Sequence, residues 1–169
     1  ESVEISSEHN PRDFLAVAAA SYNLPSISPT ANGGARGAEE PPGMDFQLSE
    51  YHADLVAATR ELARGRFGPT AYTREDDGVL PREYLTFLAE QGLAGITIPV
   101  EDGGQGGKLL DAVLVIETVA QVCPIAGDCV QALNFGAIQQ VAKNGSAAQK
   151  AKHLAPGLRG ERLFSIGMT

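Results

Sequence analysis

The stretch that decides the fold is residues 109–122, with the sequence LLDAVLVIETVAQV. Apolar side chains recur around nearly the whole helical period, so a helix here offers little polar surface to water and should pack on several sides. Glycines within 103–107 supply a loop before the stretch, and Pro124 supplies a stop after it. The stretch is too short to cross a bilayer, and Asp111 and Glu117 interrupt it. We therefore predict the central helix of a helical core and no membrane span.

Composition and charge narrow the class of protein. The chain has 169 residues, 43% of them hydrophobic, which is enough for one domain with a substantial core. The 21 acidic and 13 basic residues give a net charge of -8 without a basic cluster, which argues against a nucleic-acid partner. No signal peptide or transit segment is visible, although the chain begins with Glu1, so a cytoplasmic location is the default expectation.

The two cysteines do not suggest a metal site. Cys123 and Cys129 lie on either side of Pro124 without the C-x-x-C spacing of metal and redox motifs. We predict two reduced, partly buried thiols and no metal.

Residues 1–43 differ in character from the rest of the chain. Proline, glycine and small polar residues break any regular periodicity over 26–43, so this part is expected to be a linker or an extended tail. A short helix is possible over 11–21. The whole leader is either disordered or an arm that packs on a partner, and its sequence does not decide between these.

Two amphipathic helices are expected before the glycine-rich loop. Ser49 is the predicted N-cap of the first helix. Its apolar stripe consists of Leu48, Tyr51, Leu55, Ala58, Leu62 and Phe67. Pro81 opens the second helix and Gly92 closes it. Residues 93–100, LAGITIPV, are predicted to be a short extended segment.

The glycine-rich loop over 103–107 invites comparison with dinucleotide-binding motifs. Gly104-Gln105-Gly106 lacks a third glycine at the required position, and no strand-helix-strand repeat surrounds it. We predict a flexible turn rather than a phosphate cradle.

Two further helices are predicted after Pro124. Asp128 is the expected N-cap of a helix that runs to about Lys143, with Gly136 inside it. A glycine within a helix costs about 1 kcal/mol relative to alanine, so close packing against another backbone or a ligand is expected there. Ser146 and Gln149 then form a capping box for a helix that ends near 156–157. A small basic surface is expected from Lys143, Lys150, Lys152 and His153.

Several motifs occur in an order that is similar to a known family. They are LPREYLTFLAEQGLAGI at 80–96, IP at 98–99, GGQG at 103–106, NGSAAQKAKHLAP at 144–156 and GERL at 160–163. This set resembles the N-terminal helical domain of the acyl-CoA dehydrogenases over about residues 46–169. The resemblance implies an all-α helical bundle over 44–162, with 163–169 beginning the first strand of a middle β-domain that this chain lacks.

The family implies a flavoenzyme of fatty acid metabolism. Such an enzyme oxidises an acyl thioester between its α and β carbons and passes a hydride to FAD. By this resemblance, the residues that line the isoalloxazine ring are Ile166, Gly167, Met168 and Thr169, with Ile166 where the family commonly has an aromatic residue. The central helix and the helix from Asp128 would then lie nearest the acyl chain and form one wall of the substrate and flavin pocket.

The reaction also needs a carboxylate base in a site that excludes water. Glu101, Glu117 and Glu161 are available, but their positions in loops and on a helix surface do not favour that role. We expect no catalytic residue on this chain. The base and the β-domain would come from a second chain, a cleaved continuation or a part missing through truncation, and the chain is expected to be stable only with that complement. A homo- or hetero-oligomer is expected.

Two other classes of function stay open. One is a flavin-dependent monooxygenase or oxidase on the same fold. The other is a non-enzymatic helical module that binds a partner and carries no flavin. The sequence leaves the acyl group, the thiol carrier and the electron acceptor undetermined.

Overall fold

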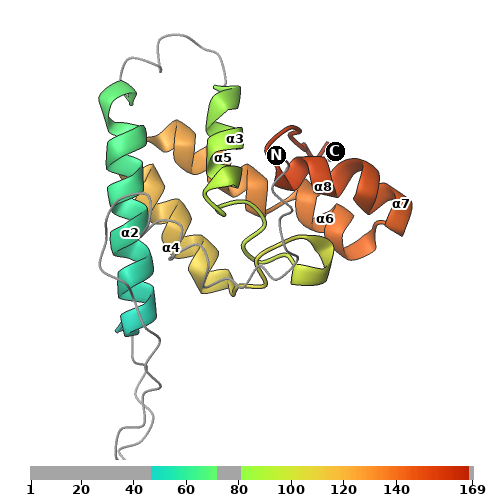
Figure 1. The fold of residues 1–169 in the computed structure, drawn as a ribbon, viewed down its shortest axis with the longest axis horizontal. Helices are drawn as coiled ribbons and strands as arrows, with labels where there is room; N and C mark the ends of the chain where they lie inside the picture. Colours follow the sequence, from blue (N-terminus) through green and yellow to red (C-terminus); the bar gives the residue numbers. More distant parts are fainter. Residues whose placement is uncertain (1–46, 72–80, 168–169) are drawn as a thin grey trace, which may run out of the picture.

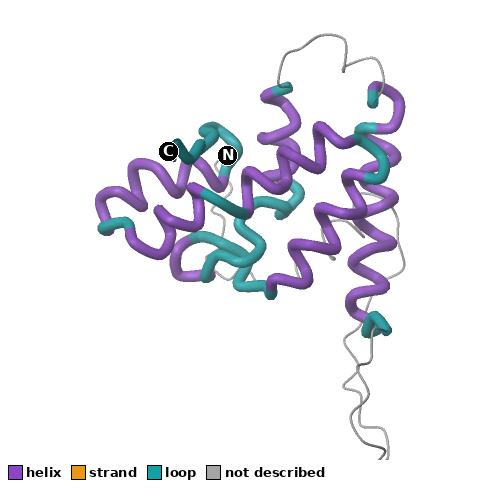
Figure 2. The backbone as a smooth tube through the Cα atoms, turned by 180° about the vertical axis from the view of Figure 1, so that it is seen from behind, coloured by secondary structure: helices purple, strands orange, loops and turns teal. Residues whose placement is uncertain are grey.

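The computed structural model describes residues 47–71 and 81–167, and its regular elements there are all helical. Figures 1 and 2 show this helical arrangement, with no strand in the described part of the chain. The predicted all-helical fold is therefore confirmed. The elements in chain order are α2 (Glu50–Arg66), η1 (Gly68–Thr70), α3 (Arg82–Glu90), η3 (Val100–Asp102), α4 (Leu109–Ala120), α5 (Pro124–Asn134), α6 (Ala137–Asn144), α7 (Ala147–Gln149), the π-helical turn η4 (Lys150–Leu154) and α8 (Ala155–Leu158).

The described residues leave some predictions untested. The leader over 1–43, with its expected helix at 11–21, lies outside them. Met168 and Thr169 lie outside them as well. The domain boundaries and the β-strand expected from residue 163 onward therefore remain predictions.

Helix α2 begins as its sequence indicates. The hydroxyl of Ser49 accepts a hydrogen bond from the backbone N–H of His52 at 3.3 Å, which confirms the predicted N-cap. The middle of the predicted apolar stripe is buried, at Leu55, Ala58 and Leu62. The stripe is exposed at its start, where Leu48 and Tyr51 retain 45% and 38% of their accessible surface.

Helix α4 is the predicted central helix, and it packs against both α2 and α5 (Figure 1). Its buried apolar residues are Ala112, Leu114, Val115 and Val119. The expectation that it would be covered on several sides is only partly correct. Leu109, Leu110 and Val113 form an uncovered apolar face, with exposed fractions of 63%, 45% and 45%.

The close contact between α4 and α5 depends on a glycine. A Cβ atom on Gly127 would lie 2.6 Å from the Cβ of Ala120, so a larger residue would force the helices apart. Helix α5 begins at Pro124, four residues before the predicted N-cap at Asp128, and that prediction is wrong. A proline fits the first helical position because its fixed φ is already helical and its missing N–H has no intrahelical partner to lose.

The predicted single helix from Asp128 to Lys143 is also wrong. Helix α5 ends at Asn134 and α6 starts at Ala137, with a corner at Phe135 and Gly136 between them. Gly136 has φ 69° and ψ -126°, a conformation that only glycine adopts readily. The corner therefore explains why a glycine stands within an apparently continuous helical pattern.

Residues 93–98 form consecutive turns, so the predicted extended segment is wrong as well. The reason is the fully buried side chain of Asn134. Its Oδ1 accepts a hydrogen bond from the N–H of Ile96 at 2.6 Å, and its Nδ2 donates to the carbonyls of Leu93 at 2.7 Å and Val130 at 2.8 Å. The Asn134 side chain thus satisfies the N–H of Ile96 and the carbonyl of Leu93, while the carbonyls of Gly95, Ile96 and Ile98 accept hydrogen bonds from the backbone of the glycine-rich loop at 105–107.

The final helical stretch runs from Ala147 to Leu158 through three consecutive elements. The predicted capping box is confirmed, because Ser146 Oγ accepts from the N–H of Gln149 and the Gln149 side chain accepts from the N–H of Ser146. The stretch ends at Leu158, one residue past the predicted end near 156–157, but Pro156 does not stop it. Pro156 lies in the first turn of α8, directly after the π-helical turn, and the chain remains helical there.

Two apolar clusters form the interior. The larger joins α2, α3, α4 and α5. The smaller lies among the helices that follow the corner, and its buried members are Ile98, Ile138, Ala142 and Leu154. Across the described ranges, no helix combines the length and apolar character needed to span a membrane.

We predict that Asn134→Asp destabilises the fold by about 3 kcal/mol, because a carboxylate oxygen would face the carbonyls of Leu93 and Val130 in place of the donor that they require. The measurement is urea unfolding followed by circular dichroism. Asn144→Asp makes the same change at an exposed position and should cost no more than about 0.5 kcal/mol. Equal losses in both variants would contradict the role assigned to Asn134.

Candidate functional site

The corner between α5 and α6 is held by a second amide. Gln139 Nε2 donates to the backbone carbonyl of Asn134 at 2.9 Å and to Thr97 Oγ1 at 2.7 Å. Because the carbonyl of Asn134 can only accept, the Gln139 side chain must present its NH2 group there. The corner is therefore tied to the 93–98 turn by both Asn134 and Gln139.

The last described residues lie back over this corner. Phe164 packs against the smaller apolar cluster and lies where a Cβ on Gly157 would be. Ile166 follows, and its Cδ1 lies 3.6 Å from the position that a Cβ on Gly136 would occupy. Ile166 is 49% exposed, and no atom lies within 4 Å of the position that a Cβ on Gly167 would take. The two described residues of the predicted flavin site thus present an open, apolar surface beside the corner.

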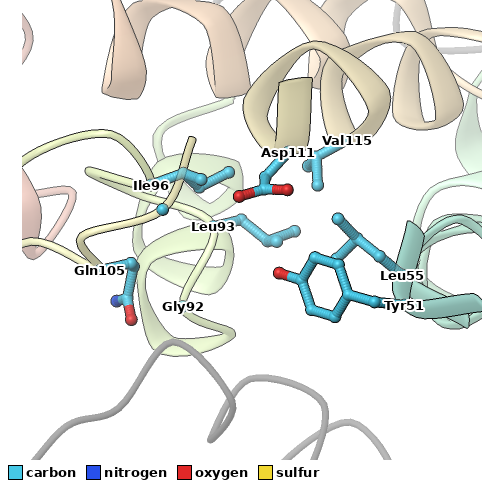
Figure 3. Close-up of a pocket in the computed structure, with 9 residues that line it drawn as sticks. Tyr51, Leu55, Gly92, Leu93, Ile96, Gln105, Asp111 and Val115 are labelled. Carbon is cyan, nitrogen blue, oxygen red and sulfur yellow. The ribbon is translucent and has the colours of Figure 1, made fainter. Parts of the chain in front are cut away.

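A small, mostly apolar cavity lies elsewhere, between α2, the segment after α3 and α4 (Figure 3). Its volume is about 20 Å3, enough for about one water molecule and far too small for a flavin or an acyl chain. Its lining residues are Tyr51, Leu55, Gly92, Leu93, Ile96, Gln105, Gly107, Asp111 and Val115. In Figure 3 the Tyr51 ring and the Asp111 carboxylate face the same space from α2 and α4.

Asp111 is the main polar contact between α2 and α4. Its side chain is 8% exposed, and its Oδ1 accepts a hydrogen bond from His52 Nε2 at 3.0 Å. Its Oδ2 accepts from the N–H of Lys108 at 2.7 Å, at the start of α4. The other ring nitrogen of His52, Nδ1, lies 2.8 Å from Ser49 Oγ. A chain of hydrogen bonds therefore runs from the N-cap of α2 to the first turn of α4.

This Ser-His-Asp chain serves to join helices. Ser49 Oγ is engaged as the cap of α2, and one carboxylate oxygen of Asp111 is engaged at the start of α4. The same carboxylate acts on its neighbour Tyr51, whose pKa is raised first by burial and then by the negative charge of Asp111. Tyr51 therefore stays protonated and neutral at physiological pH.

The three glutamates considered as bases are all exposed. Glu101 lies in η3 and Glu117 on the outer face of α4. Glu161 pairs with Arg159, with Arg159 Nε donating to its Oε1 at 2.6 Å, and this bond lowers the pKa of Glu161. A base for α-proton removal needs a site that excludes water, and these positions do not provide one within the described chain.

The predicted basic surface is partly neutralised. Lys150 Nζ donates to both carboxylate oxygens of Asp102, at 2.8 and 2.7 Å, and so ties the last helical stretch to η3. Arg162 Nη1 lies 3.5 Å from His153 Nδ1. Lys143 and Lys152 are exposed.

Cys123 and Cys129 are buried and form no disulfide, as predicted. Burial, followed by the charge of Asp128 and the nearby Cys123, raises the pKa of Cys129 to about 11. Within residues 47–71 and 81–167, no group of three or more His, Cys, Asp or Glu side chains is placed to hold a metal ion.

The sequence did not indicate two sets of buried hydrogen bonds, which we call polar clamps: those of Asp111 between α2 and α4, and those of Asn134 and Gln139 at the α5–α6 corner. Asp111 was considered only as a charge that interrupts an apolar helix, although an acidic residue in the first turn is a recognised helix-start signal. Asn134 and Gln139 gave no signal for their bonds to Leu93, Ile96 and Thr97, since these partners lie 38 to 42 residues away along the chain.

Comparison with known proteins bears directly on this architecture. The family model described as "Acyl-CoA dehydrogenase, N-terminal domain" matches residues 49–161, well over half of the chain. The chain belongs to the acyl-CoA dehydrogenase family. The matched range begins at the N-cap of α2 and ends just after α8, so it contains every described helix.

Individual relatives carry different names. The chain is 38% identical over 104 residues to a 3-sulfinopropanoyl-CoA desulfinase of Variovorax paradoxus, covering 62% of this chain and 26% of the relative. It is 28% identical over 126 residues to a short-chain-specific acyl-CoA dehydrogenase of Clostridium acetobutylicum, covering 75% of this chain and 33% of the relative. The structure is similar to butyryl-CoA dehydrogenase from Megasphaera elsdenii, with a TM-score of 0.61, 25% identity, and coverage of 71% of this chain and 32% of that one. The chain thus spans between a quarter and a third of the length of these relatives.

We predict that Asp111→Ala destabilises the protein by about 2–3 kcal/mol, because it leaves His52 Nε2 and the N–H of Lys108 without their acceptor. Glu117→Ala removes an exposed carboxylate from the same helix and should change stability by less than about 0.5 kcal/mol. Urea unfolding of both variants tests this. A loss in Asp111→Ala no larger than that in Glu117→Ala would show that the clamp does not stabilise the fold.

We also predict slow reaction of Cys129 with a thiol reagent in the native protein. Only the thiolate is nucleophilic, and a pKa of about 11 in place of 9.0 leaves roughly a hundredfold less thiolate at pH 8, before burial limits access. In a Cys123→Ser background, release of thionitrobenzoate from Ellman's reagent should be slow at pH 8 and become fast in guanidinium chloride. Fast release from the native variant would contradict the buried, protonated state.

Proposed function

We propose that this chain forms one wall of the substrate and flavin pocket of an FAD-dependent, acyl-CoA dehydrogenase-like enzyme. The observation that carries the proposal is the match to the family's N-terminal domain over 49–161. Supporting it, the chain leads from α8 directly into an exposed apolar segment beside the α5–α6 corner. The complete enzyme would oxidise an acyl thioester between its α and β carbons.

The flavin contacts of this chain would be Ile166, Gly167, Met168 and Thr169. Ile166 and Gly167 suit this role because a flat ring can reach both the exposed apolar side chain and the open backbone beside it. Met168 and Thr169 lie outside the described residues and enter the proposal through the resemblance. FAD would supply the hydride acceptor, and this chain would supply an apolar surface that excludes water from one side.

The catalytic base would come from the remainder of the enzyme. Glu101, Glu117 and Glu161 are exposed and lie on loops or an outer helix face. The proposal therefore assigns this chain the roles of binding and orienting the substrate. The remainder would be a second chain or a continuation of this one, and the assembled enzyme would be a cytoplasmic homo- or hetero-oligomer.

A second candidate reaction is favoured by the sequence comparison. The 38% identity is to a protein named for desulfination of 3-sulfinopropanoyl-CoA, whereas the short-chain dehydrogenase is 28% identical. In that alternative the substrate is still an acyl-CoA, but the carbon–sulfur bond breaks, the carbon takes up a proton, and the sulfur dioxide that leaves adds water to become sulfite. No hydride is transferred to the flavin. The two reactions share the acyl thioester and differ in what leaves the β carbon.

The test is a visible absorption spectrum of the chain purified together with the polypeptide that completes the enzyme. We expect a flavin spectrum that bleaches without oxygen on addition of one member of a panel of saturated acyl-CoA thioesters. 3-Sulfinopropanoyl-CoA is added separately, with sulfite measured as the product.

The outcomes separate the candidates. Sulfite release without lasting bleaching would establish desulfination. A flavin that no thioester bleaches, with oxygen consumed on turnover of another substrate, would indicate a monooxygenase or oxidase. A well-folded complex without flavin would overturn the enzyme proposal and leave a helical interaction module.

A further inference from the structure

The α5–α6 corner has weak support from the backbone alone. Before it, the N–H of Phe135 donates to the carbonyl of Gln131 at 2.8 Å. After it, the first bond of α6 runs from Gln140 to the carbonyl of Gly136 and is long, at 3.4 Å. Gly136 is also the N-cap of α6, and a glycine has no side chain with which to cap a helix.

The side chain of Gln139 supplies hydrogen bonds that hold the corner in addition to those of the backbone. It lies in the first turn of α6, and it donates one hydrogen bond to the carbonyl of Asn134, the last residue of α5, and one to the hydroxyl of Thr97 in the 93–98 segment. Both bonds are short, at 2.9 and 2.7 Å, and the side chain is partly buried. Gln139 therefore fixes the direction in which α6 leaves α5.

The position of Ile166 follows from that direction. Its Cδ1 lies 3.6 Å from where a Cβ on Gly136 would be, which is an ordinary van der Waals distance. Phe164, two residues earlier, packs against the smaller apolar cluster, to which α6 contributes Ile138 and Ala142. A shift of the corner or of α6 would thus carry the 164–167 segment with it.

We propose that Gln139, with Thr97 as its partner, is a positioning residue that holds the α5–α6 corner and thereby sets Ile166 and Gly167 against the flavin. The inference rests on the proposed function, in which this segment contacts FAD. Gln139 itself touches neither flavin nor substrate. It acts through the backbone of Asn134 and Gly136.

The test compares two matched variants in the complete flavoenzyme. Gln139→Glu removes both donors and places a carboxylate oxygen against the carbonyl of Asn134. Gln140→Glu adds the same charge one residue later, at an exposed position. There the Oε1 only accepts, from Asn144 Nδ2 at 3.1 Å, and a glutamate can still do so.

For Gln139→Glu we expect about a tenfold rise in the FAD dissociation constant, a shifted or less resolved flavin absorption band, and a fall in kcat that exceeds any rise in KM. Gln140→Glu should match the unmodified enzyme in all three. Thr97→Ser keeps the hydroxyl acceptor and should also match it, whereas Thr97→Val should share the defect of Gln139→Glu to a smaller degree. The flavin spectrum separates positioning from a simple loss of stability, which would lower occupancy without altering the bound chromophore.

The failure of each hypothesis has its own signature. If the unmodified complex holds no FAD, the proposed function fails, whatever the variants do. If it holds FAD, and Gln139→Glu equals Gln140→Glu in affinity, spectrum and kcat, the positioning role is overturned while the proposed function stands. Should Gln139→Glu not fold, Thr97→Val decides the matter: an unchanged spectrum and FAD affinity in that variant would overturn the inference.

Discussion

The buried amide of Asn134 is the interaction on which the described part of this chain depends most. In one side chain it provides the acceptor for one backbone N–H and the donors for two backbone carbonyls. Leaving such groups unpaired in the interior costs about 1–3 kcal/mol each. An apolar residue of similar size at position 134 would therefore leave the N–H of Ile96 and the carbonyl of Leu93 without a hydrogen-bond partner. The turns, the end of α5 and the corner that follows are thereby held as one unit, and the smaller apolar cluster is built from that unit onward.

A second polar contact acts at the same end of the central pair of helices, away from their connection at 121–123. Asp111 ties the start of α4 to α2, while Asn134 ties the end of α5 to the segment after α3. Near that connection α4 and α5 pack closely at Gly127. Apolar packing alone would permit the helices to slide along each other, because it is non-directional. The two polar contacts restrain α4 against α2 and α5 against residues 93–96, and so add directional constraints to the apolar packing.

Sequence reasoning succeeded where the determining signal is local and failed where it is not. The caps at Ser49 and Ser146 lie within three residues of the groups they bond, and both were predicted correctly. The central helix was predicted from the spacing of its own apolar residues. The break between α5 and α6 at Gly136 was not predicted, because apolar residues recur at helical spacing on both sides of it. The turns at 93–98 could not be foreseen because their partner, Asn134, is supplied from another helix. The family was nevertheless identified, because the order of several weak motifs is far more specific than any one of them.

The same helical domain occurs in relatives that are named for different reactions. Proteins named for desulfination and for dehydrogenation match the same helical domain, at 38% and 28% identity. A shared domain cannot by itself select between breaking a carbon–sulfur bond and removing a hydride. The groups buried in this chain are committed to holding its helices in place, as the partners of Asp111, Asn134 and Gln139 show. In the proposed function, the surface that would meet the flavin is the exposed segment beside the corner, which packs on the helices behind it. If that surface is the pocket wall, substitutions there should alter substrate preference with little effect on stability, whereas substitutions of Asp111 or Asn134 should destabilise the fold itself.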